Sequence, residues 1–164
     1  MQENTVALQA LRQAIRLEQD GYNFYTEAAE RTADSRGREM FLSLADDEKL
    51  HLRIVQDQYQ ALSTGQGWVS FSEALELKPV DVDNPLFPPE AEVIDPKASD
   101  TDALLFGLQI ENESYELYTK AASETADPAG KAMYQRLASQ ERTHFDILML
   151  NYEHLVSTGS WRAL

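Results

Sequence analysis

The sequence predicts an all-α protein, a four-helix bundle made of two copies of one helical hairpin. Apolar residues recur at the helical period of about 3.6 residues over four long stretches. Residues 18–62 also match residues 111–155 at 18 of 45 positions. The matches include acidic, histidine and tyrosine residues, which a shared apolar rhythm would not require. Duplication of a hairpin within a single domain, residues 1–164, explains both observations.

The first hairpin is expected over about residues 4–63. Its two helices are predicted at about 4–32 and about 36–63, where apolar residues keep the helical spacing. Between them, the short polar break at 33–35 interrupts the pattern. Two nearby glycines, Gly65 and Gly67, follow the second helix and are a typical stop signal.

The second hairpin is expected over about residues 101–158. The short polar side chains of residues 99–102 can cap the free amides of a helix start, and this helix should run to about Thr125. Asp127-Pro128 then signals the fourth helix, because a capping residue is followed by proline in the first turn. Gly159 is the expected stop.

A linker of residues 64–100 joins the hairpins and contains five prolines, so it cannot form one long helix. Residues 71–77 could form a short helical turn. Its length allows a crossover along the bundle side, which would make the second and third helices parallel. It also allows the hairpins to exchange between two chains, and the sequence leaves both open. Four apolar residues are expected to pack on the bundle: Val80, Val82, Leu86 and Phe87.

Composition narrows the class of protein. The net charge of −14 disfavours a nucleic-acid partner, because a polyanion is repelled by such a surface. The absence of cysteine excludes disulfides, thiolate metal sites and iron–sulfur clusters within the chain. No apolar run approaches the ~20 residues of a membrane span. The first residues also lack signal-peptide features, so we expect a cytoplasmic protein.

One motif occurs twice, at the same spacing. A glutamate is followed thirty residues later by Glu-x-x-His, and the whole pattern recurs 93 residues further on. The glutamate and histidine of Glu-x-x-His share one helix face. Carboxylate with imidazole favours iron, manganese or zinc over calcium or magnesium. The six candidate metal ligands are Glu18, Glu48, His51, Glu111, Glu141 and His144.

Each hairpin should bring its own motif together. Residues equidistant from the turn of an antiparallel hairpin lie side by side, and the midpoint of each motif falls at an expected turn, Ala33-Asp34 or Asp127-Pro128. The competing interpretation is a set of surface carboxylates with buried, hydrogen-bonded histidines. Apolar residues flank both clusters, however, so unpaired carboxylates there would be costly to bury. We therefore expect two metal ions in the bundle core.

Four tyrosines lie near the same helical faces. Tyr22 and Tyr25, with Tyr115 and Tyr118, stand four and seven residues beyond the first glutamate of each motif, within about 40° of its direction. A phenol there could hydrogen-bond a ligand carboxylate. Core packing is the alternative, and it weighs most for Tyr22 and Tyr115. His154 aligns with an alanine of the other half and is expected to be a surface histidine.

These residues and spacings resemble the ferritin-like di-iron carboxylate superfamily and, within it, the rubrerythrin group. The resemblance covers both hairpins but not residues 64–100. It implies that the six residues ligate two metal ions, most often iron, with zinc or manganese as alternatives. It also implies that Glu48 and Glu141 bridge the ions and that Tyr25 and Tyr118 support the ligands.

Two features depart from the rubrerythrin pattern. Rubrerythrins commonly carry another glutamate three residues after the third-helix ligand, where this chain has Ser114. Glu113 and Glu116 are close, but their helical angles make them poor replacements. Rubrerythrins also commonly carry a four-cysteine rubredoxin domain, which a chain without cysteine cannot contain.

The resemblance implies an oxidoreductase that reduces hydrogen peroxide or dioxygen, in oxidative-stress defence or iron oxidation. Its electrons would come from an external donor, and no catalytic residues are expected beyond the metal ligands. The alternative is a non-catalytic metal-binding or iron-handling protein. We expect a homo-oligomer, with a dimer favoured, and neither nucleic acid nor a membrane as a partner.

Overall fold

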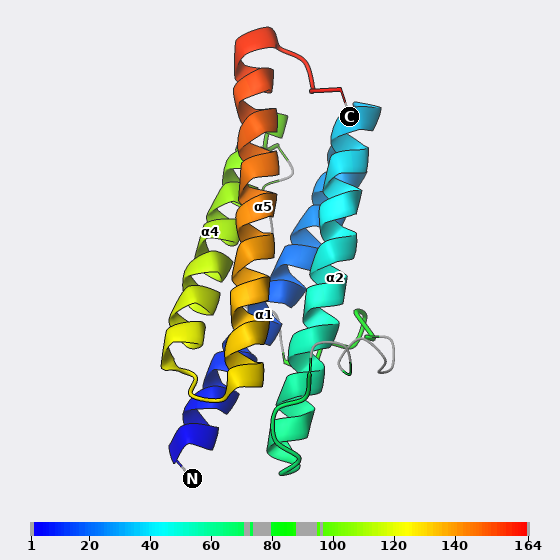
Figure 1. The fold of residues 1–164 in the computed structure, drawn as a ribbon. Helices are drawn as coiled ribbons and strands as arrows, with labels where there is room; N and C mark the ends of the chain where they lie inside the picture. The colour runs from blue at the N-terminus through cyan, green and yellow to red at the C-terminus, as the bar shows by residue number, and fades with distance from the viewer. Residues whose placement is uncertain (1, 71–72, 74–79, 88–94, 96, 164) are drawn as a thin grey trace.

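The computed structural model describes residues 2–70, 73, 80–87, 95 and 97–163 (Figure 1). These residues form α-helices and no β-strands, which confirms the predicted all-α fold. The helix ends fall within two residues of the predicted ones. With the labels of Figure 1, the helices are α1 (Gln2–Arg31), α2 (Ser35–Ser63), α4 (Asp100–Glu124) and α5 (Pro128–Thr158).

The four helices of the chain form one bundle. Helices α1 and α2 form the first antiparallel hairpin, and α4 and α5 form the second. Helices α2 and α4 run in the same direction, since both begin at the end of the bundle where α1 finishes (Figure 1). This parallel orientation of α2 and α4 is the one expected of a bundle with a long crossover connection.

Equivalent caps begin the second helix of each hairpin. The Asp34 side chain accepts a hydrogen bond from the backbone amide of Arg36, and Asp127 accepts from the amides of Ala129 and Gly130. Such caps satisfy amides that have no partner inside the helix. Both aspartates lie in the turns that were predicted from the midpoints of the two motifs.

The described part of the linker lies against α1 and α2. The side-chain amide of Gln58 pairs with the backbone of Val69, and the side-chain amide of Gln19 donates to the carbonyl of Val82. Farther along, Arg31 donates to the carbonyl of Asp95 near the end of α1. These contacts follow the bundle from one end to the other and hold the crossover in place.

Three of the four linker residues that were expected to pack do so. Val80, Val82 and Phe87 are partly buried against the core, and the Phe87 ring contacts Tyr59 at a centroid distance of 5.5 Å. The prediction for Leu86 is wrong, because this residue is 44% exposed. Phe87 packs against the bundle, and the adjacent Leu86 side chain faces solvent. The possible helical turn at 71–77 lies outside the described residues, apart from Glu73.

Two tryptophans tie the hairpins together at opposite ends of the bundle. Trp161, which follows α5, covers Gly37 at the start of α2; a Cβ on that glycine would lie 2.5 Å from the indole Cε2. Trp68, which follows α2, covers Gly130 at the start of α5, with a corresponding distance of 2.7 Å. Each hairpin therefore seals a helix start of the other, with glycine allowing the close approach.

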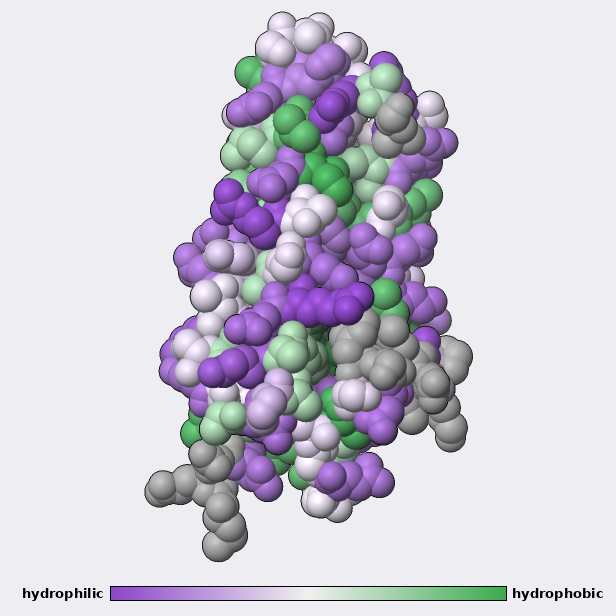
Figure 2. Space-filling view, in the orientation of Figure 1, coloured by the Kyte–Doolittle hydropathy of each residue, from purple (hydrophilic) through white to green (hydrophobic). Residues whose placement is uncertain are grey.

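Two hydrophobic clusters fill the bundle, one toward each end. One contains Leu11, Ile15 and Leu52, and the other contains Phe24 and Phe41. On the outside, hydrophilic and intermediate side chains cover most of the face in Figure 2, with hydrophobic residues in small separate groups. None of the helices in the described residues is long and apolar enough to cross a lipid bilayer.

Replacing Gly37 with alanine should destabilise the fold. Alanine favours helix over glycine by about 1 kcal/mol. The added methyl group, however, would lie 2.5 Å from the rigid Trp161 indole, so the cost should be in the upper part of the about 1–3 kcal/mol range for overpacking and exceed that gain. We expect a Tm lower by roughly 2–6 °C, measured by circular dichroism. Ser43→Ala, at an exposed position of the same helix, is the control. An unchanged or higher Tm for Gly37→Ala would contradict the close packing.

Candidate metal centre

The six residues of the repeated motif meet inside the bundle. They come from all four helices, and each is at most 3% exposed. This burial is unusual, because ionisable side chains are seldom fully buried unless they are paired or bind a cation. Helix α1 contributes Glu18, α2 contributes Glu48 and His51, α4 contributes Glu111, and α5 contributes Glu141 and His144.

The six residues form two overlapping groups, each able to surround one cation. In each group the potential ligand atoms all lie within 4.8 Å of one another. Glu48 and Glu141 belong to both groups. They are therefore the two residues that could bind both cations. The two groups are Glu18, Glu48, His51 and Glu141, and Glu48, Glu111, Glu141 and His144.

Each histidine directs its Nδ1 atom toward the carboxylates. His51 Nδ1 lies 3.2 Å from Glu141 Oε1 and 3.5 Å from Glu18 Oε2. His144 Nδ1 lies 3.0 Å from Glu48 Oε1, and the two imidazole rings stack with centroids 5.5 Å apart. Each histidine thus approaches the shared glutamate of the other hairpin, so the centre needs both hairpins.

The outer nitrogens of the histidines have partners that sequence reasoning missed. His144 Nε2 lies 3.0 Å from Asp47 Oδ2, and His51 Nε2 bonds Gln140 Oε1. Because these oxygens only accept, each Nε2 carries a proton, and each Nδ1 is the nitrogen that can coordinate a metal. A signal was present, since Asp47 and Gln140 are equivalent polar positions, each preceding the glutamate of Glu-x-x-His.

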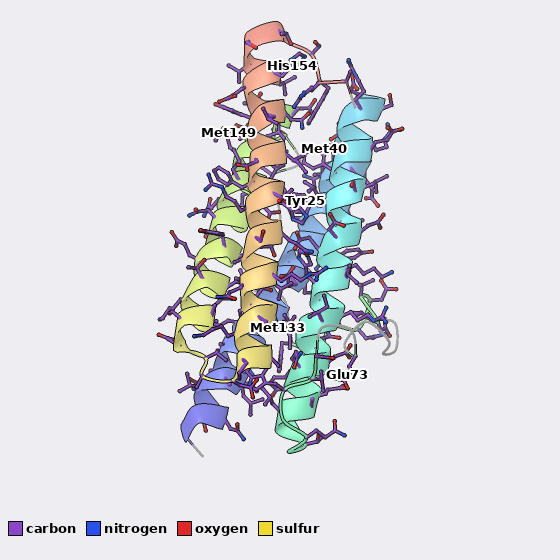
Figure 3. All side chains as sticks on the ribbon, in the orientation of Figure 1. Tyr25, Met40, Glu73, Met133, Met149 and His154 are labelled. Carbon is purple, nitrogen blue, oxygen red and sulfur yellow. The ribbon has the colours of Figure 1, made fainter. Side chains whose placement is uncertain are left out.

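Two tyrosines bond the centre across the hairpins. The Tyr25 hydroxyl on α1 donates to Glu111 on α4, and the Tyr118 hydroxyl on α4 donates to Glu18 on α1. Both tyrosines are fully buried, and Figure 3 labels Tyr25 within the bundle. An aromatic ring packs on each, Phe41 at 6.2 Å from Tyr25 between ring centroids. These contacts hold the two non-shared carboxylates in place.

Tyr22 and Tyr115 take no such part. Both are partly buried against the hydrophobic clusters, and among the described residues neither phenol bonds a cluster carboxylate. The expectation for this pair is therefore corrected to core packing. The physical reason is helical angle: a residue four positions on is rotated about 40°, whereas one seven positions on is rotated only about 20°. His154 lies near the end of α5, outside both groups (Figure 3).

The extra glutamate of many rubrerythrins has no substitute among its neighbours. Ser114 is buried, with 2% of its surface exposed. Glu113 and Glu116 are exposed and accept hydrogen bonds from side-chain amides on their own helix. The centre therefore has four carboxylates and two imidazoles.

Without a cation, the centre must hold protons. Burial and then repulsion by the neighbouring carboxylates raise the pKa of Glu48 and of Glu141 well above the usual range. Burial alone would lower the pKa of His51 and His144, but the surrounding carboxylates outweigh it and raise both. Glu18 differs: despite its burial, the attraction of His51 lowers its pKa to about 2.

Protons do not satisfy every atom of the centre. One oxygen of each carboxylate and the Nδ1 of His144 are buried without a hydrogen-bond partner. Such atoms are costly to bury and call for an explanation. Two divalent cations would fit, because their four positive charges would balance four carboxylates and their coordination would use the unpaired atoms. The buried Glu/His cluster therefore has the composition of a di-metal site.

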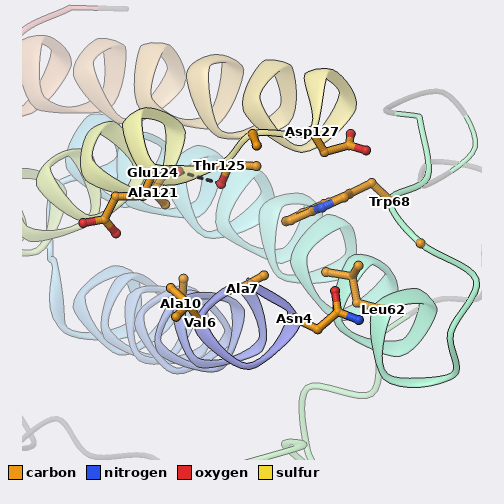
Figure 4. Close-up of a pocket in the computed structure, with 12 residues that line it drawn as sticks. Asn4, Val6, Ala7, Ala10, Leu62, Trp68, Ala121, Glu124, Thr125 and Asp127 are labelled. Atoms are coloured by element: carbon orange, nitrogen blue, oxygen red, sulfur yellow. Dashed lines mark hydrogen bonds between the residues drawn. The ribbon is translucent and has the colours of Figure 1, made fainter. Parts of the chain in front are cut away.

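A cavity of about 500 Å³ lies elsewhere, at the end of the bundle where α1 begins. Figure 4 shows it between α1, the end of α2 and the α4–α5 turn, with Trp68 and Leu62 among its lining residues. None of the six cluster residues lines this cavity, so the metal centre is a separate, closed site.

A bundle in which two helices each supply a glutamate and two each supply Glu-x-x-His defines a ferritin-like di-metal carboxylate protein. The family model described as Rubrerythrin matches residues 9–152, both hairpins included. The chain therefore belongs to the rubrerythrin family, and the resemblance drawn from the motif is confirmed. Among curated proteins, none matches this chain significantly.

The metal-free protein should lose stability as pH rises from about 5 to about 8. Glu48, Glu141 and both histidines have raised pKa values in the folded state, so the folded protein binds more protons than the unfolded chain. The stabilisation from these groups is complete at a pH below their pKa values in the unfolded chain. It is lost as the pH rises through their higher pKa values in the folded protein. Glu18, with its lowered pKa, matters only at acid pH, where its stabilising effect is lost.

The measurement is Tm against pH after exhaustive treatment with chelator. Glu48→Gln should flatten the fall, because it removes one of the titrating groups. Exposed Glu113 is the matched control, and Glu113→Gln should leave the slope unchanged. A Tm that is constant or rises with pH in the chelated wild type would contradict the protonation described above.

Proposed function

We propose that the centre binds two iron ions and that the protein is an oxidoreductase that reduces hydrogen peroxide or dioxygen. The observation that carries the proposal is the pair of overlapping ligand groups that share Glu48 and Glu141. In this proposal, Glu18 and His51 would hold one ion, Glu111 and His144 would hold the other, and Glu48 and Glu141 would be shared between them. Membership of the rubrerythrin family supports iron over zinc or manganese.

The chemistry supplied by the ions is electron transfer: two ferrous ions together can give the two electrons that, with two protons, convert hydrogen peroxide into two water molecules. The protein must hold the ions close together and keep other reactants out. The shared carboxylates would hold the ions close together. The hydrophobic clusters toward both ends of the bundle would keep other reactants out.

The tyrosines act as fixed hydrogen-bond donors in this scheme. Burial and then the nearby carboxylates raise the pKa of Tyr25 and of Tyr118 well above 10, so both phenols keep their protons at physiological pH. A protonated phenol that bonds a carboxylate acts as the hydrogen-bond donor, so the direction of each bond is fixed. Tyr25 thereby orients Glu111, and Tyr118 orients Glu18, so that their other oxygens face the centre.

Electrons must come from outside the chain. Residues 1–164 contain no cysteine, so they supply no rubredoxin-type iron site. We therefore propose an external electron donor. A homodimer in the cytoplasm remains part of the proposal.

Rapid oxidation by peroxide is the test of this function. Anaerobic protein loaded with ferrous iron should become ferric within seconds of mixing with hydrogen peroxide, using one peroxide for each pair of ions. Stopped-flow absorbance in the near ultraviolet follows the reaction. Glu48→Ala should lose iron and rapid oxidation together, because it removes a shared ligand, whereas Glu113→Ala should behave like the wild type.

Two results would contradict the proposal. One is ferrous iron that survives for minutes in the presence of peroxide. The other is protein from iron-supplied cells that carries a full complement of zinc and has no oxidase activity. Either result would favour metal binding without turnover, for which the same buried ligands are sufficient.

A further inference from the structure

The two halves of the centre differ in the residue behind each histidine. Asp47 on α2 accepts from His144 of α5, and Gln140 on α5 accepts from His51 of α2. These two residues occupy equivalent positions of the internal repeat, 93 residues apart. The surrounding hydrogen bonds otherwise keep the symmetry, since Tyr25 and Tyr118 bond equivalent glutamates. A carboxylate therefore stands on one side where a neutral amide stands on the other.

The difference should change how well each histidine binds a cation. A carboxylate that accepts the outer N–H of an imidazole increases the electron density at the inner nitrogen, and it adds a negative charge one ring away from the metal. A neutral amide increases the electron density at the inner nitrogen less strongly, and it adds no negative charge. The His144 side chain is buried, so its bond to Asp47 is largely shielded, although the Asp47 side chain itself is 54% exposed.

The remaining ligands do not offset this difference. Each position has one glutamate of its own, Glu18 or Glu111, and the same two shared glutamates. The distances are also similar, with each Nδ1 3.5 Å from its own glutamate oxygen. Charge and donor types in the two inner sets are thus equal, and Asp47 is the added negative charge.

We propose that the two metal positions are unequal and that the position formed by Glu111 and His144 fills first. The ion at the position of Glu18 and His51 is then the weaker and more exchangeable one. Asp47 is a positioning residue in this proposal, since it acts through His144 and does not bind the ion itself. The proposal rests on the two-ion centre of the proposed function, but it requires no redox activity.

Zinc is a suitable probe because it binds carboxylate and imidazole and does not change oxidation state. Two binding steps alone would not decide the question, since two cations that share carboxylates repel each other. The order of filling decides it. The protein has three histidines, so nuclear magnetic resonance of the ring nitrogens can follow each one during a zinc titration of chelated protein. His154, far from the centre, is an internal reference.

In the wild type, the His144 signals should shift during the first equivalent of zinc and the His51 signals during the second. Asp47→Asn should weaken the first calorimetric step by about tenfold or more, within the range known for lost partners of metal-bound histidines. The control is Asp46→Asn, which removes the same charge from an exposed neighbour on α2 and should change neither step.

The charge-conserving double variant Asp47→Asn with Gln140→Glu gives the sharpest result. It moves the carboxylate from one side to the other without changing net charge, so the order of filling should reverse, with His51 shifting first. Simultaneous shifts of both histidines in the wild type, or an unchanged order in the double variant, would overturn the proposal. Ordered zinc filling in a protein that fails to oxidise iron would instead refute only the proposed redox function.

Discussion

The burial of four carboxylates at the centre of an apolar bundle is the constraint on which the rest of this structure depends. Like charges at these distances repel strongly once water is excluded. Without cations, the centre must retain protons, as the raised pKa values of Glu48 and Glu141 indicate. Such an arrangement sacrifices stability for binding. The packed core on both sides, with its buried aromatic and aliphatic residues, offsets that cost.

Contacts between the two hairpins give the centre its shape. The Tyr25 hydroxyl bonds a glutamate of the second hairpin, and Tyr118 bonds one of the first. Trp68 and Trp161, at opposite ends of the bundle, likewise each pack on a glycine of the other hairpin. A single hairpin has a glutamate, a Glu-x-x-His and a tyrosine. The carboxylate that the tyrosine bonds, the partner of the outer histidine nitrogen and the second shared glutamate all come from the other hairpin. Both hairpins must therefore dock before either position can hold an ion as described.

Departures from the internal symmetry are as informative as the symmetry itself. Duplication alone would make the two halves of the centre equivalent. Asp47 and Gln140 break that equivalence directly behind the histidines, and buried Ser114 replaces a glutamate that many rubrerythrins carry. Each position therefore has three carboxylates, its own glutamate and the two shared ones, and Glu113 and Glu116 add no further one. Metal affinity and order of filling therefore depend on residues outside the repeated motif.

The amino-acid sequence by itself determined the four helices, their turns and the six buried residues of the centre. Helical period, capping residues and fixed spacing are local properties of the sequence, and the internal repeat shows each of these signals twice. Only the tertiary structure decided that Gln140 and Asp47 bond the histidines, that Tyr25 and Tyr118 each bond a glutamate of the other hairpin, and that Leu86 faces solvent. Those outcomes depend on which side chains meet across helices that are far apart in the chain. The spacing within one helix gives the direction of a side chain but not the partner that it meets.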